Sequence, residues 1–445
     1  MSTAEIEGHV KQVYSQPHTK FSLLLTGGGT QVLPWLLTVP GASSCLLEGN
    51  VPYATTALRS LLGKAPVQYC SESTAADMAR VALKRNATLL LEETRSFQSL
   101  TENNVFGVAC TAALVSSSPK RGPHRCFVAS ASPGSTTVAS VELMKGERGR
   151  TRVGEDYVCS RLVLEAVAGR SGLPPMPRDY LIDAAEEGSE SVTTTETENR
   201  AEDHIQGLLD GRSTAVLAVP SRCGASGADP FVLYEDVDLP GNTIVFPGSF
   251  NPVHEGHVLF AASVVGEMNK REEASPLVVF EISVTNADKP PLSSAEILRR
   301  LNLFSQNNPM FSESGLSNYA VCLTTKPLFL GKTEIFKGCR FLVGSDTMVR
   351  LLNTKYYSDS NSEMLVALSS IAERKCSFIV AGRVEQNSSG ASAPEFLTCD
   401  GVLERVGGDL PGSVVSLFEG LPESTFRSDI SSTEIREQIN SEGRK

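Results

Sequence analysis

A ten-residue stretch, Gly248–His257, constrains the fold of this chain more than any other part of the sequence. It is rich in glycine and proline, it follows the apolar run Thr243–Phe246, and it precedes Val258–Val265, which contains no helix breaker. The pattern predicts a buried strand, a loop and a helix that starts near Gly256. Such a junction suits phosphate, because glycine lets the backbone approach a ligand and a helix N-terminus presents free N–H groups.

His254 and His257 lie in this stretch, and the whole chain has only six histidines. On the first turn of a helix, two rings three residues apart face the same side, where they can donate hydrogen bonds to phosphoryl oxygens. The alternative is a strand–helix junction with two surface histidines. The motif resembles the HxGH signature of the nucleotidylyltransferase superfamily and, in more detail, the first motif of the nicotinamide/nicotinate mononucleotide adenylyltransferases. The matching positions are Gly248, Phe250, Pro252, His254, Gly256 and His257.

A second motif lies near the C-terminus, where Ser431, Ser432 and Thr433 precede the helical pattern 434–439. Hydroxyls at this position predict a helix N-cap cluster, which together with the helix dipole forms an anion site. Arg436 lies one turn into the helix and can donate two hydrogen bonds to a phosphate. The alternative is an ordinary capped helix. The segment resembles the ISSTxxR motif of the same family at every position.

Two further segments lie between these motifs. The apolar run Leu277–Val284 is typical of a strand in a parallel sheet, and Lys289 follows its C-terminal end. Ligands of open α/β sheets bind at such ends, so Lys289 is either a phosphate contact or a solvated turn lysine. In family members a basic residue after this strand contacts the substrate.

The run Arg340–Val343 predicts another strand, which ends at Gly344 and Asp346. This segment resembles the family's GxD motif, which lies at the adenine–ribose side of the nucleotide pocket. Asp346 could cap the following helix, accept a hydrogen bond from a ribose hydroxyl, or do both. Tyr356 and Tyr357 are candidates either for a wall against a pyridine or adenine ring or for packing.

The resemblance implies that residues 241–445 form a Rossmann-like nucleotidylyltransferase domain with a parallel sheet. It implies transfer of AMP from ATP, bound with Mg²⁺, to a phosphorylated acceptor, with release of pyrophosphate and with no metal-ligand cluster in the protein. The leading acceptor is nicotinamide or nicotinate mononucleotide. The implied catalytic residues are His254, His257, Lys289 and Arg436, and the implied nucleotide-binding residues are Gly248, Ser249, Phe250, Gly256, Gly344, Asp346, Ser431, Ser432 and Thr433.

Two alternatives stay open for this region. One is cytidylyl or adenylyl transfer to another phosphorylated small molecule, because the two motifs do not recognise the acceptor. The other is a nucleotide sensor or scaffold without catalysis. Retention of both histidines and of Arg436 favours an enzyme, because a domain without chemistry could lose them freely.

Residues 21–172 alternate strand-like runs with helical patterns, which predicts a separate α/β domain. Thr26–Gly28, Val39–Ser44 and Asn50–Tyr53 resemble the C-terminal domain of the competence-damage-inducible protein CinA, a nicotinamide mononucleotide amidohydrolase family. Active members carry a nucleophilic serine and a lysine where this chain has Leu24 and Leu58. Since leucine can neither attack an amide nor accept a proton, we expect the domain to be inactive as a hydrolase. Oligomerisation into a homo-oligomer, ligand sensing or structural support are its remaining candidate roles.

The remaining segments are predicted to be an N-terminal tail or short helix (1–20), an acidic linker (173–205) and a connector (206–240). The net charge of −11 argues against nonspecific binding to nucleic acid or to an anionic membrane, so an anionic substrate needs a locally basic pocket. The ten cysteines are scattered, which together with the lack of a signal peptide predicts reduced thiols in a cytoplasmic protein.

Overall fold

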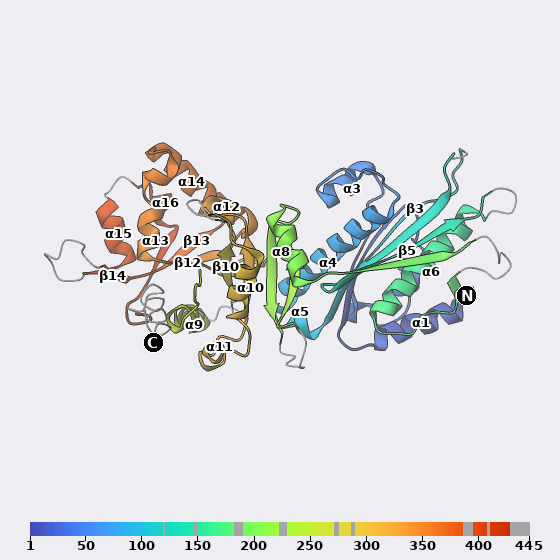
Figure 1. The fold of residues 1–445 in the computed structure, drawn as a ribbon, viewed down its shortest axis with the longest axis horizontal. Coiled ribbons are helices and arrows are strands. Elements are labelled where there is room, and N and C mark those ends of the chain that lie inside the picture. Colours follow the sequence, from blue (N-terminus) through green and yellow to red (C-terminus); the bar gives the residue numbers. More distant parts are fainter. Residues whose placement is uncertain are drawn as a thin grey trace. The chain divides into compact units, whose positions relative to one another are not determined.

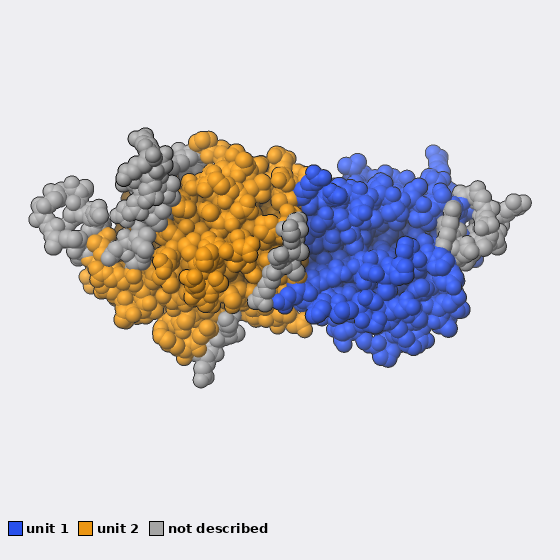
Figure 2. Space-filling view, turned by 60° about the horizontal axis from the view of Figure 1, so that its bottom comes forward, with its two compact units in different colours: residues 1–90, 102–200 blue, residues 91–101, 201–445 orange. Residues whose placement is uncertain are grey.

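The computed structural model describes residues 1–118, 121–145, 150–181, 190–221, 229–270, 276–285, 290–385, 395–406 and 410–427. The chain divides into two compact units (Figures 1 and 2). Unit 1 comprises residues 1–90 and 102–200, and unit 2 comprises residues 91–101 and 201–445.

Unit 1 is built on a six-stranded sheet with the order β2-β1-β3-β4-β5-β6. Its strands are β1 (Thr19–Thr26), β2 (Leu46–Asn50), β3 (Asn104–Ala113), β4 (His124–Ala131), β5 (Ser135–Leu143) and β6 (Val192–Glu198). Its helices are α1 (Thr3–Ser15), α2 (Val32–Leu37), α3 (Thr55–Leu62), α4 (Glu72–Thr94), α6 (Arg152–Arg170) and α7 (Arg178–Leu181). The last residues of α4 and all but the last residue of α5 (Ser99–Glu102) belong to unit 2. Strand β1 is parallel to β2 and β3, whereas β3 to β6 are antiparallel.

Two cores cover the two faces of this sheet. One contains buried residues of α1 and α6, and the other contains Ala75, Met78 and Ala82 of α4. Consecutive residues of β1 point to opposite faces, so Leu23 belongs to the first core and Leu24 to the second. The residues around Ala87–Leu91, which look strand-like in the sequence, continue helix α4, because a run of apolar residues is compatible with both structures.

Two segments of the chain differ from the sequence analysis, and a third follows one of its two alternatives. Of the tail and the short helix left open for the N-terminus, residues 3–15 form the helix, with a capping box, and its buried Ile6, Val10 and Val13 make it part of the core of unit 1. Residues 192–198, expected within the acidic linker, form the edge strand β6. Its threonines favour extended structure and its glutamates suit an exposed edge. Residues 91–101 pack with unit 2, where Phe97 and Leu100 are buried.

Unit 2 is built on an eight-stranded sheet with the order β16-β13-β12-β9-β10-β11-β7-β8. Its strands are β7 (Ala215–Pro220), β8 (Phe231–Glu235), β9 (Ile244–Pro247), β10 (Val278–Ser283), β11 (Tyr319–Thr324), β12 (Arg340–Gly344), β13 (Ser377–Ala381) and β16 (Phe418–Leu421); β14 (Arg383–Glu385) and β15 (Glu395–Leu397) form a separate ribbon. The helices are α8 (Ala201–Leu209), α9 (Glu255–Lys270), α10 (Ser294–Asn302), α11 (Pro309–Glu313), α12 (Phe329–Ile335), α13 (Ser345–Leu351), α14 (Asn361–Glu373), α15 (Cys399–Val406) and α16 (Gly412–Val415).

The strands from β16 to β11 are parallel, and the chain runs from β9 outward through β10 to β11 before it returns to β12 on the other side of β9. This is the strand order of a doubly wound Rossmann-like sheet, with helices on both faces (Figure 1). The expected α/β class and Rossmann-like domain are confirmed. The predicted connector supplies β7 and β8, which extend the sheet with antiparallel strands.

The strand order also tells where a ligand belongs. In open α/β sheets the ligand crevice lies beyond the carboxyl ends of the strands, where the order reverses. In unit 2 that point lies between β9 and β12. The loop after β9 begins at Gly248, and β12 ends at Gly344, which is the N-cap of α13.

Candidate functional site

The loop between β9 and α9 is anchored from below by one aromatic ring. Phe250 has a positive φ of 42° and is only 1% exposed, with its ring against Phe246, Phe280 and Phe304. A residue with a side chain would not fit at position 248, because a Cβ on Gly248 would lie 2.6 Å from the Phe250 ring. The implied nucleotide-binding role of Phe250 therefore does not extend to its ring, which lies in the core and lines neither of the cavities described below.

Two arginines of α10 hold the same loop from the side. Arg300 Nη1 donates to the Ser249 carbonyl at 2.9 Å, and Arg299 Nη2 donates to Asn251 Oδ1 at 2.5 Å. Glu296 accepts from both guanidinium groups at 2.7 Å, and these bonds lower the pKa of its carboxyl to about 2. The loop is thus fixed by charged hydrogen bonds to one backbone carbonyl and one side chain, and such bonds are stronger than neutral ones.

The two histidines stand together where the loop enters α9. Their rings are stacked with centroids 3.6 Å apart, and the His254 backbone N–H donates to His257 Nδ1 at 3.3 Å. A neutral imidazole carries one proton, so a ring that accepts at Nδ1 holds that proton at Nε2. His257 is therefore prepared to donate a hydrogen bond from Nε2.

Burial keeps both rings neutral. It lowers the pKa of His254, with a smaller contribution from the positive charge of Arg383. Burial and then the neighbouring His254 lower the pKa of His257 from 6.5 to about 3. Near neutral pH the pair consequently acts through hydrogen bonds and not through fixed positive charge.

The lowered pKa values predict a pH-dependent stability of unit 2. Below pH 6.5 His257 is protonated in the unfolded chain, whereas in the folded protein it takes up a proton only when the pH nears 3. The free energy of unfolding should therefore fall as the pH drops through this window and be fully restored above it. His257→Gln should reduce proton uptake on unfolding by about one proton. The measurement is urea unfolding between pH 4.5 and 7. Unfolding is monitored through the peroxide oxidation of Met268, which is buried in α9 of the folded protein.

A control for this pH dependence is His18→Asn, because His18 is an exposed histidine of unit 1. It should leave the pH dependence at Met268 unchanged. The account of the buried ring would be contradicted if the urea midpoint measured at Met268 changed with pH in the same way in wild type and in His257→Gln.

A smaller cavity of about 230 Å³ opens in front of the histidines. Its lining includes His254, Gly256, His257, Gly344, Asp346 and Arg383. Asp346 makes no capping hydrogen bond to α13, whose N-cap is Gly344. Of the two roles weighed for this carboxylate, capping is therefore wrong. Instead Asp346 Oδ2 lies 3.8 Å from Arg383 Nη1, and its Oδ1 folds over Gly344, where a Cβ would be only 2.6 Å away.

The described part of the chain reaches the smaller cavity at Phe426, four positions before the C-terminal motif. Phe426 lines this cavity and stacks on Phe260 of α9 with ring centroids 4.7 Å apart. The residues that give the motif its chemistry, Ser431, Ser432, Thr433 and Arg436, lie outside the described residues, as does Lys289. Their proposed contacts with phosphate stay predictions.

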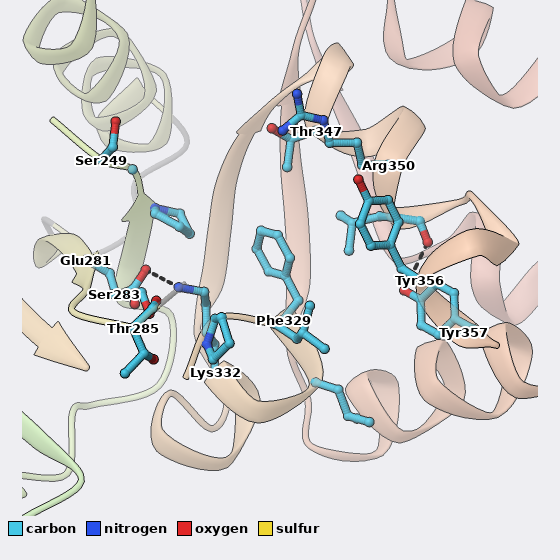
Figure 3. A pocket seen from close by; sticks show the side chains of 16 residues that line it. Ser249, Glu281, Ser283, Thr285, Phe329, Lys332, Thr347, Arg350, Tyr356 and Tyr357 are labelled. Carbon is cyan, nitrogen blue, oxygen red and sulfur yellow. Dashed lines mark hydrogen bonds and ion pairs between the residues drawn. The ribbon is translucent and has the colours of Figure 1, made fainter. Parts of the chain in front are cut away.

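A larger cavity of about 430 Å³ lies on the other side of Pro247, and Pro247 and Thr347 line both cavities. Figure 3 shows its two walls. One wall carries Ser249, Glu281, Ser283, Thr285 and Lys332, and the other carries Phe329, Arg350, Tyr356 and Tyr357. Its volume is within the range of small-molecule sites. The larger cavity thus combines a polar wall with an aromatic wall, next to the glycine loop.

Three charged residues of the larger cavity were missed by the sequence analysis. Glu281 was visible as a lone carboxylate in an otherwise apolar strand, which is a signal of a functional or paired charge. Lys332 and Arg350 give no comparable signal, because their helices carry ordinary surface patterns. Arg350 is exposed and makes no ion pair with another residue in the described ranges.

In unit 1, Leu24 and Leu58 are both buried and belong to one hydrophobic cluster with α4. The loss of hydrolase activity expected from these two leucines stays a prediction. Across the described ranges there is no group of three or more His, Cys, Asp or Glu side chains placed to hold a metal ion. No helix in these ranges is long and apolar enough to cross a bilayer.

Solved structures similar to this chain come from CinA-like proteins, and the likeness covers its N-terminal part. The competence/damage inducible protein CihA of Agrobacterium tumefaciens is 22% identical, with 37% of this chain and 95% of that chain aligned and a TM-score of 0.30. A CinA superfamily protein of Escherichia coli is 14% identical, with 38% and 87% aligned and a TM-score of 0.27.

The C-terminal part matches a different group. A candidate nicotinamide mononucleotide adenylyltransferase of Schizosaccharomyces pombe is 27% identical over 148 residues, which are 32% of this chain. The match spans 55% of the length of that relative. The family model described as cytidylyltransferase-like matches residues 245–438, which include both motifs and both cavities. Residues 245–438 therefore form a cytidylyltransferase-like domain.

Proposed function

We propose that unit 2 transfers AMP from ATP to a phosphorylated acceptor, with nicotinamide or nicotinate mononucleotide as the leading candidate. The observation that carries this proposal is the pair of neutral histidines beside two adjoining cavities. Reaction between two bound substrates needs such an arrangement, because most of the rate enhancement comes from holding the reacting atoms in line. The name of the fission yeast relative supports the choice of acceptor.

In the proposed reaction an oxygen of the acceptor's phosphate attacks the α-phosphorus of ATP. The new O–P bond forms as the bond from the α-phosphorus to the bridging oxygen breaks, and pyrophosphate leaves with that electron pair. No proton has to be removed from the nucleophile, which is already anionic. The protein's task is therefore to position the two phosphates and to stabilise the charge on the α-phosphoryl oxygens.

The smaller cavity is the proposed ATP site. The Nε2–H of His257 would donate to an α-phosphoryl oxygen, and the stacked His254 would support that ring. Asp346 is free of a capping bond and would accept from a ribose hydroxyl, and Arg383 adds positive charge nearby. The resemblance assigns Ser431, Ser432, Thr433 and Arg436 to the departing phosphates and Lys289 to the acceptor.

The larger cavity is the proposed acceptor site. Tyr356 is 46% exposed on the aromatic wall, where it can stack on a planar ring. Arg350 supplies an accessible guanidinium for the acceptor's phosphate. Mg²⁺ fits the proposal without a protein cage, because it is commonly held by substrate phosphates and water, and it would supply charge neutralisation on the triphosphate.

The proposal is tested by pyrophosphate release from the full chain with Mg²⁺, when ATP and CTP are crossed with nicotinamide mononucleotide, nicotinate mononucleotide and other phosphorylated small molecules. We expect release to require both a nucleotide and an acceptor, with ATP and a pyridine mononucleotide as the productive pair. CTP as the preferred donor would move the assignment to cytidylyl transfer. Bound ATP with no release for any acceptor would contradict the enzyme and favour a nucleotide sensor.

A further inference from the structure

The polar wall of the larger cavity is built around a buried ion pair. Lys332 Nζ donates to Glu281 Oε2 at 2.5 Å, and Thr324 Oγ1 donates to Glu281 Oε1 at 2.5 Å. Glu281 is 0% exposed and Lys332 is 5% exposed, yet both residues line the cavity. Figure 3 shows the lysine and the carboxylate joined on the wall opposite the tyrosines. Lys332 would contact a ligand, and Glu281 would hold the Lys332 ammonium group in place and neutralise its charge.

A buried charge pair is seldom retained for stability alone, because desolvation offsets most of the attraction between the two charges. Its position matters here, since it lies in the lining of a site-sized cavity. A neutralised lysine keeps hydrogen-bond donors but presents little net charge to a ligand. The lysine therefore suits an uncharged oxygen that accepts a hydrogen bond better than it suits an anion. An anion would lose its hydration here and would find no cation whose charge is still unneutralised.

Two hydroxyls of the same cavity wall use their protons in hydrogen bonds to backbone carbonyls. Ser283 Oγ donates to the Thr285 carbonyl at 2.7 Å, and Thr285 Oγ1 donates to the Thr325 carbonyl at 2.7 Å. A hydroxyl has a single proton, so toward the cavity these oxygens can only accept. The wall thus offers a donor at Lys332 and acceptors at Ser283 and Thr285.

We propose that the Lys332–Glu281 pair makes the larger cavity selective for an acceptor whose ring bears an uncharged carboxamide, over the same acceptor with a carboxylate. This inference rests on the proposed function, whose acceptor it narrows to the amide form. A carboxamide has an oxygen for Lys332 and an NH₂ group for the hydroxyl oxygens. A carboxylate has only hydrogen-bond acceptors. It would face two hydroxyl oxygens that can only accept and a lysine whose charge is neutralised by Glu281.

The experiment measures equilibrium binding of nicotinamide mononucleotide and of nicotinate mononucleotide to the full chain by calorimetry, so it does not depend on turnover. Wild type should bind the amide form more tightly. Glu281→Gln leaves Lys332 without its counter-charge, so it should shift the amide/acid ratio of dissociation constants toward the acid by about tenfold or more. The double variant Glu281→Gln/Lys332→Met removes the unmatched cation and should abolish that gain.

Glu334→Gln provides the matched control. Glu334 forms an exposed ion pair with Lys326 at 3.2 Å, neither residue lines the larger cavity, and the ratio should not change. A ratio that stays within about twofold of wild type in Glu281→Gln, while that variant unfolds more easily, would show a purely structural pair and overturn the inference alone. Absence of binding of either mononucleotide to wild type would overturn the proposed acceptor and this inference together.

Discussion

Replacing His257 by alanine should slow nucleotidyl transfer by about 10²–10³-fold, the usual cost of removing one donor to a developing phosphoryl or oxyanion charge. The reason is specific to this ring. Its Nδ1 accepts the His254 N–H, which directs the proton to Nε2, and burial keeps the ring neutral. Alanine removes the donor and leaves the loop anchors at Phe250 and Arg300 in place.

The measurement is the rate of pyrophosphate release at saturating ATP and acceptor, compared with wild type. The loss should appear in kcat more than in KM, because the hydrogen bond strengthens as charge develops. His9→Ala, which changes a histidine of unit 1, is the control and should leave the rate unchanged. A rate for His257→Ala within a few-fold of wild type would remove this ring from the chemistry.

Replacing Lys332 by methionine should destabilise unit 2 by about 3–5 kcal/mol, the cost of leaving one partner of a buried pair uncompensated. Glu281 is fully buried, and in this variant its remaining hydrogen bond comes from Thr324. Adding Glu281→Gln should recover most of the loss, since both charges are then gone. Lys326→Met breaks the exposed pair with Glu334 and should cost at most about 1 kcal/mol.

Stability has to be followed within unit 2, because the single tryptophan, Trp35, reports on unit 1. Peroxide oxidation of buried Met268 along a urea series supplies the unfolding midpoint. If Lys332→Met and Lys326→Met shift this midpoint equally, the Lys332–Glu281 pair is not the buried, mutually dependent pair described above.

Much of unit 2 follows from local sequence. The strand–loop–helix junction at Gly248–His257 and the strands around Leu277–Val284 and Arg340–Val343 all appear where the pattern predicts them. These features depend on neighbours within a few positions of the chain, such as an apolar run or a breaker. The alternation of strands and helices favours an α/β class with a parallel sheet, and the Rossmann-like domain was implied by the family resemblance.

Features that depend on distant partners could not be predicted in this way. Lys332 and Glu281 are 51 positions apart, and no spacing rule connects them. The place of the Phe250 ring in the core follows from the rings of Phe280 and Phe304, which other segments bring to it. Asp346 lies in the first turn of α13, and its carboxylate faces Arg383, which follows strand β13.

Unit 1 illustrates the same division. Leu24 and Leu58 predict a loss of hydrolase chemistry through the family resemblance, and the structure adds that both side chains lie in one apolar cluster. The sequence left a tail and a short helix open for residues 1–20, and it gave no sign of strand β6, because the surfaces that these two segments cover come from distant parts of the chain. Tertiary contacts decided both elements.

The most direct test of adenylyl transfer is the fate of two labels in ATP, one on the α-phosphorus and one on the γ-phosphorus, after incubation with the full chain, Mg²⁺ and nicotinamide mononucleotide. The account predicts that the α label enters a dinucleotide while the γ label leaves in pyrophosphate. Release of the γ label as orthophosphate, with the α label retained in ADP, would show ATP hydrolysis and contradict the account.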